Sequence, residues 1–95
     1  MLLKLELLEK IKSGEVDLVF RRWNRPSVRA NGTLKTKVGL LQIGLIDDME
    51  PDDVSEADAK RAGFVDVADF RKWLDTMKPG HLFQRIEIGY RGDAA

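Results

Sequence analysis

The stretch GEVDLVFRRWNRP, residues 14–26, joins a strand-like pattern to three arginines and a tryptophan. Apolar side chains recur at every second position over residues 16–20, which predicts a half-buried β-strand. If these side chains face the core, Arg22 follows them in phase, whereas Arg21 and Trp23 point to the opposite face. The expected strand therefore carries cationic side chains on two faces.

A helix is expected before this strand, and strand-like sequence follows it. Residues 2–12 carry apolar residues at helical spacing, and Ser13-Gly14 ends the helix with a residue that accepts left-handed dihedrals. Asn31-Gly32 marks a loop, because Asn-Gly accepts positive φ. Residues 33–49 then predict one long bent strand or a pair of strands, since the alternation slips by one position at Leu40-Leu41 beside glycines.

The last third of the chain predicts two short helices and a final strand. Ser55 with Asp58 is a helix N-cap pattern, and Asp66 caps a second helix with one apolar stripe. Residues 82–90 read as the closing strand. The order of elements indicates an α+β fold.

Size and composition point to one small domain over residues 1–95. The chain has 43% hydrophobic and 34% charged residues, so it has enough apolar surface to fold. It has no cysteine and one histidine, so we expect no intrinsic metal and no cofactor. No apolar run approaches the roughly 18 residues of a membrane span, and we expect a cytoplasmic protein.

Positive and negative charges are segregated along the chain, although the net charge is zero. Residues 21–37 contain six cations and no acid, whereas residues 47–69 contain nine acids and two cations. Local fields of this kind decide which partners a surface attracts. The acidic run lacks the ligand register of an EF-hand loop.

The basic segment has the residue types that bind single-stranded nucleic acid. Guanidinium groups of Arg21, Arg22 and Arg25 can bind phosphate, and Trp23 can stack on an unpaired base. Lys35 and Lys37, two residues apart on one strand face, would extend this surface. Alternatively, Trp23 is buried at one end of a small β-barrel, and the arginines pair with some of the nine acids of residues 47–69.

Several motifs resemble the ASCH domain, a relative of the PUA RNA-binding domain. The matching segments are IKSGEVDLVFR (11–21), GTLKTK (32–37), EADAKRAGF (56–64) and the closing strand with Arg85 and Ile86. The resemblance implies a small PUA-like β-barrel with flanking helices. It also implies a cleft suited to RNA or a nucleotide.

The chain departs from one catalytic branch of that family. In that branch, which deacylates a modified cytidine, a lysine, a threonine and a glutamate act together. The corresponding positions here hold Val16, Val19 and Ala62. The resemblance therefore implies a binding cleft without that chemistry.

We therefore expect a domain that binds RNA or a nucleotide-like ligand through a basic and aromatic surface, formed by Arg21, Arg22, Trp23, Arg25, Lys35, Lys37 and Arg85. One alternative is a small hydrolase or ribonuclease that uses Arg21 and Lys35, with Arg85 or Glu87. Another is a protein-interaction module that uses the acidic helix surface. The sequence leaves the ligand and the oligomeric state open.

Overall fold

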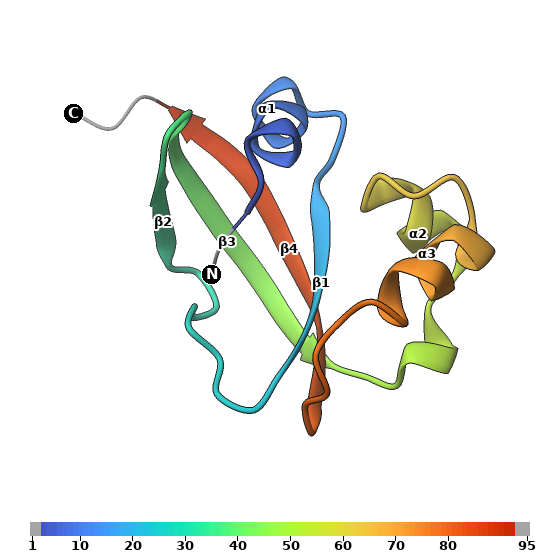
Figure 1. The fold of residues 1–95 in the computed structure, drawn as a ribbon. Coiled ribbons are helices and arrows are strands. Elements are labelled where there is room, and N and C mark those ends of the chain that lie inside the picture. The colour runs from blue at the N-terminus through green and yellow to red at the C-terminus, as the bar shows by residue number, and fades with distance from the viewer. Residues whose placement is uncertain (1–2, 93–95) are drawn as a thin grey trace.

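The computed structural model describes residues 3–92 and confirms the α+β fold class (Figure 1). In chain order the elements are α1 (Leu5–Ser13), β1 (Leu18–Trp23), β2 (Thr33–Thr36), β3 (Gly39–Asp48), the 3-10 turn η1 (Pro51–Asp53), α2 (Glu56–Arg61), α3 (Val67–Leu74) and β4 (Leu82–Gly92). Leu2, where the first helix was predicted to start, and the last three residues of the predicted domain lie outside the described residues.

The four strands form one antiparallel sheet in the order β1-β4-β3-β2. β4 and β3 are central, so β1 and β2 each pair with one neighbour. The sheet curls into a half-barrel that leaves β1 and β2 as its two edges (Figure 1). The predicted barrel is thus present in this more general form.

Residues 33–49 fold as a pair of strands. Thr36 closes β2, its hydroxyl donates to the carbonyl of Gly39 at 2.8 Å, and β3 begins there. The expected slip is confirmed, because the register with β4 shifts between Leu40 and Leu41. Lys37 lies in the tight turn after β2, so its predicted place on the strand with Lys35 is wrong.

The first half of β1 is buried on both faces, so the prediction of a half-buried strand is wrong there. Leu18 and Phe20 are fully buried in a core shared with α2 and α3. Val19, between them, is buried in a second core under α1, with Ile86 and Ile88 of β4. The three-residue apolar run of β1 therefore serves two cores, one on each side of the sheet.

The helices begin and end where local chemistry predicts. The Ser55 hydroxyl accepts the amide of Asp58 at 3.1 Å, and the Asp66 carboxylate accepts the amide of Asp69 at 2.8 Å, which confirms both N-caps. Gly14 follows α1 with φ of 84° and satisfies a helix-end carbonyl, as the αL cap requires. Among residues 3–92, no helix is both long enough and apolar enough to cross a bilayer.

Phe20 lies in the part of β1 that is buried on both faces, and of the substitutions tested we expect its truncation to destabilise the fold most. Its ring stacks on Phe83 at 5.6 Å and contacts Phe70 at 5.2 Å. We expect Phe20→Ala to lower the free energy of unfolding by about 3–5 kcal/mol, because the vacated space cannot collapse. At about 4–8 °C per kcal/mol, the thermal midpoint falls by roughly 12 °C or more.

Leu45→Ala is the matched control, since Leu45 is an apolar residue that is 58% exposed. We expect its thermal midpoint to stay within a few degrees of the parent value, because exposed substitutions change stability by about 0.5 kcal/mol or less. Equal midpoints for Phe20→Ala and the parent would contradict the packing described for β1.

Candidate ligand-binding cleft

A cleft of about 350 Å³ runs along the free edge of β1. The cleft is lined by both Val19 and Phe20. Because these two side chains face opposite sides of the sheet, the opening lies at the strand edge. The lining residues come from α1 and the residue before it, from β1, and from the α2–α3 connection and α3. Figure 1 shows α1 and the α2–α3 pair on different sides of β1. The lining residues are Lys4, Leu7, Lys10, Val19, Phe20, Arg21, Ala62, Gly63, Phe64 and Trp73.

Arg21 supplies a half-buried positive charge to this cleft. Its Nη1 donates to the carbonyl oxygen of Phe20 at 2.9 Å. Burial lowers the pKa of Arg21, because a charged guanidinium loses hydration there. Arginine nevertheless stays protonated in proteins, so the site keeps its charge and attracts anions more strongly than a fully solvated cation does.

α1 adds two further cations. Lys4, the residue before the first helical turn, and Lys10 both line the cleft on the same side as Leu7. No ion pair joins either lysine to an acid within residues 3–92. None of the described residues that line the cleft is acidic. The described lining of the cleft therefore carries three positive charges and no negative one, in a protein of zero net charge.

The opposite side is aromatic. Phe64 and Trp73 are both partly exposed, and their ring centroids are 5.3 Å apart. Both rings also contact the buried Phe70, at 5.6 Å and 5.9 Å, so the core holds them in place. Such rings can stack on a planar group or lie against a cation.

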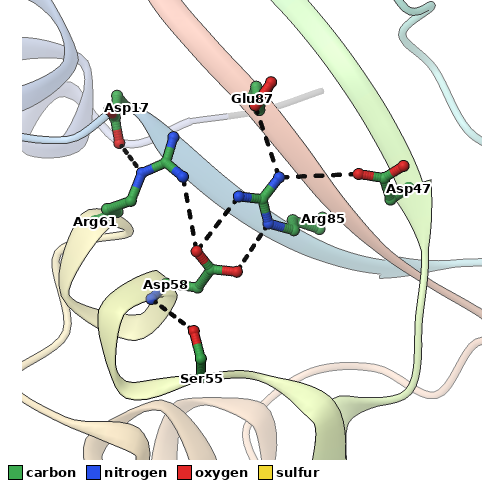
Figure 2. Close-up of polar contacts among 7 residues, drawn as sticks. All are labelled: Asp17, Asp47, Ser55, Asp58, Arg61, Arg85 and Glu87. Atoms are coloured by element: carbon green, nitrogen blue, oxygen red, sulfur yellow. Dashed lines mark hydrogen bonds and ion pairs between the residues drawn. The ribbon is translucent and has the colours of Figure 1, made fainter.

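An ion-pair network ties the aromatic side to the sheet (Figure 2). Arg85 of β4 donates through Nε and Nη2 to Asp58 of α2, at 2.8 Å and 3.3 Å. Its Nη1 also lies 3.8 Å from Asp47 and 3.7 Å from Glu87. Arg61, the last residue of α2, binds Asp17 just before β1 at 2.9 Å.

The two side chains of the central pair are mostly covered, with 18% of Arg85 and 20% of Asp58 exposed. The hydrogen bond from Arg85 lowers the pKa of Asp58, and the same bond raises the pKa of Arg85. α2 leads directly into Ala62, Gly63 and Phe64, so the network positions that side of the cleft.

Of the residues predicted to bind a ligand, one lines this cleft. Arg21 lines the cleft, and Arg85 lies in the ion-pair network. Arg25, Lys35 and Lys37 are exposed on the loop after β1, on β2 and in the turn that follows it. Their part in binding remains a prediction.

Arg22 and Trp23 lie on opposite faces of β1. Arg22 is half-buried on the face of Phe20, opposite Phe83 in the pairing with β4. The Trp23 ring packs against the core under α1, and its Nε1 donates to Gln84 at 2.7 Å. Among residues 3–92, neither Arg22 nor Arg25 forms an ion pair with an acid.

Two lysines and two partly exposed aromatic residues of the cleft were not among the predicted site residues. Lys4 and Lys10 are three residues on either side of Leu7, a spacing that keeps all three near one helix face. Phe64 and Trp73 belong to segments read as a helix end and a core stripe. Tertiary packing brings these residues to the same cleft as Arg21, and no local sequence pattern predicts this.

A second hollow, of about 360 Å³, is lined by Asp48, Glu50, Asp53 and His81, with Met49, Leu82 and Phe83. The His81 ring nitrogen Nδ1 lies 2.8 Å from the Asn24 side-chain oxygen. Within residues 3–92, no set of three His, Asp or Glu side chains is placed to hold a metal ion.

Comparison with known proteins gives no relative: no family model, no curated protein and no solved structure matches this chain.

The Arg85–Asp58 pair predicts a specific dependence of stability on pH. Because the pKa of Asp58 is lower in the folded state than its unfolded value of about 3.9, its ionised form stabilises the fold above that pH. This contribution is lost as the pH falls from about 4 through the folded pKa. We expect the difference in stability between the parent and Asp58→Asn to be largest at neutral pH and to shrink below about pH 4.

Asp52→Asn is the control, since the Asp52–Arg71 contact of 2.9 Å is close in length to the 2.8 Å contact of Asp58 with Arg85 but lies on an exposed surface. Its removal should change stability by about 1 kcal/mol or less at any pH. Urea unfolding from pH 2 to pH 7 measures all three proteins. A parent and an Asp58→Asn variant that differ equally at pH 2 and pH 7 would contradict the role of the pair.

Proposed function

We propose that this chain is an ASCH-type, PUA-like domain that binds RNA or a nucleotide-like ligand in the cleft along β1. The observation that carries the proposal is the cleft lining. Three cations, Lys4, Lys10 and Arg21, line the cleft together with the rings of Phe64 and Trp73, with no acid among the described lining residues. Phosphate and base are the two chemical groups that such a lining suits.

Two of the four segments that resemble the ASCH family, residues 11–21 and 56–64, meet at this cleft. Arg21 ends the first matching segment, and Gly63-Phe64 ends the third. The positions where the catalytic branch carries its threonine and glutamate are Val19 and Ala62, and both line the cleft. Apolar groups at these positions favour binding over the deacylation chemistry of that branch.

Gly63 explains how the two sides approach each other. It has φ of 94°, and a Cβ there would meet the Val16 side chain at 3.1 Å. A glycine therefore lets the end of α2 close against the segment before β1. This contact brings Phe64 to the same opening as Arg21.

We expect a short single-stranded RNA, phosphorylated at its 5′ end and labelled at its 3′ end, to bind the parent protein with a clear salt dependence. The double variant Lys4→Gln, Lys10→Gln should bind more weakly, and its log-log salt slope should fall by about 0.7 for each phosphate contact removed. Trp73→Leu should weaken binding by about 1–3 kcal/mol with little change of slope. Fluorescence anisotropy at several salt concentrations gives both quantities.

Lys12→Gln is the matched control, because Lys12 lies on α1 but packs over the Tyr90 ring and does not line the cleft. It should bind as the parent does, and thermal melts of every variant separate lost binding from lost folding. If Arg25→Gln and Lys35→Gln abolish binding while the cleft variants retain it, the ligand lies on the exposed basic segment and the cleft proposal fails. No binding by the parent at low salt would overturn the nucleic-acid function as a whole.

A further inference from the structure

We infer that the cleft selects a terminal phosphate, that is, the phosphomonoester of a single nucleotide or of a strand end. This inference rests on the proposed function and specifies its ligand. Three features of the cleft lead to it: its charge, its size and the separation of its cationic and aromatic sides.

The charge of the lining matches a dianion better than a monoanion. Lys4, Lys10 and Arg21 supply three positive charges to one opening. A phosphomonoester carries about −1.5 to −2 charges at pH 7 and three acceptor oxygens, because its second pKa is about 6. An internal phosphodiester carries one charge and leaves two free oxygens. The monoester therefore offers more acceptor oxygens and more negative charge to the ammonium groups of Lys4 and Lys10.

The size of the cleft favours one nucleotide over a length of strand. Its volume of about 350 Å³ lies at the lower end of the range of about 300–1,000 Å³ for small-molecule sites. Proteins that follow a single strand use basic grooves for about 4–16 nucleotides. The other exposed cations, Arg25, Lys35 and Lys37, do not line this cleft, so they do not extend it into such a groove.

The two kinds of side chain lie on different sides of β1. Lys10 belongs to α1 and Lys4 directly precedes it, whereas Phe64 and Trp73 belong to the α2–α3 unit on the other side of the strand (Figure 1). Arg21 lies between them on β1 itself. A ligand that spans the opening therefore carries its anionic group at one end and a planar group at the other, as a nucleoside monophosphate does.

The test is made with each of the four nucleosides in turn. For each one it compares three ligands that share base and sugar: the 5′-monophosphate, its 5′-methyl phosphodiester and the nucleoside itself. At pH 7.5, we expect at least one monophosphate to bind about tenfold more tightly than its methyl ester, the effect of one further hydrogen bond to a charged group. This preference should disappear by pH 5, where the monoester has lost its second charge. Isothermal titration calorimetry measures all the affinities.

At each pH the affinity for the monophosphate is divided by the affinity for its methyl phosphodiester. This ratio removes effects of protein titration that change both affinities equally. The titratable groups among the described lining residues are Lys4 and Lys10, at the start of α1 and within it, and Arg21 of β1. The lining residues from the α2–α3 unit, Ala62, Gly63, Phe64 and Trp73, carry no titratable side chain. His81 does not line the cleft and lies against Asn24. In the Lys4→Gln, Lys10→Gln variant the preference for the monoester should be lost, and Lys12→Gln should retain it.

A parallel pair of RNAs, one with a 5′-phosphate and one with a 5′-hydroxyl, separates this inference from the function beneath it. Equal binding of both RNAs, with equal binding of monoester and diester, would overturn the terminal-phosphate inference and leave the RNA-binding function standing. No binding of any nucleotide or RNA would overturn both.

Discussion

The structure depends on one constraint: β1 must satisfy two cores at once. Leu18 and Phe20 face the helical pair, and Val19 faces the half-barrel under α1. A strand buried on both faces needs a cover on each side, and each cover must end near the strand edge. The cleft is the space between these two covers. Arg21 follows the buried run directly, so its charge is placed at that opening.

The α2–α3 pair, which covers one face of β1, is held in place by several contacts that reinforce one another. The Ser55 and Asp66 caps start α2 and α3, the aromatic rings of Phe64, Phe70 and Trp73 pack together, and Arg85 anchors Asp58 to the sheet. None of these contacts is large alone. Because all of them hold the same two short helices, they keep Phe64 and Trp73 at a fixed distance from the cations across the strand.

Local chemistry made much of the fold predictable. The caps at Ser55 and Asp66, the left-handed residue Gly14 and the slip beside Leu40 all follow from short-range preferences, and the structure has each of them. The sequence pattern did not predict that β1 is buried on both faces. Alternation assigns Val19 to the outward face, so it predicts only one buried face. A continuous apolar run of three residues was the available signal.

The site was less predictable than the fold, for a physical reason. Arg21 could be selected because it belongs to the cluster of arginines and a tryptophan in residues 21–25. Its neighbours in the cleft, Lys10 and Trp73, are 11 and 52 positions away in the sequence, and only the packing of the two covers brings them together. The density of cations in residues 21–37 instead drew attention to Arg25 and Lys35, which the fold leaves on exposed surface.

The measurement that tests the central claim most directly is an amide chemical-shift map of ¹⁵N-labelled protein titrated with a short, 5′-phosphorylated single-stranded RNA. Binding in the cleft predicts that the signals of Arg21, of residues 62–64 and of the Trp73 indole shift together along one saturating curve. The signals of Arg25, Lys35 and Lys37 should stay in place. Shifts confined to residues 24–37, with the cleft signals unchanged, would contradict the claim that the edge of β1 is the binding site.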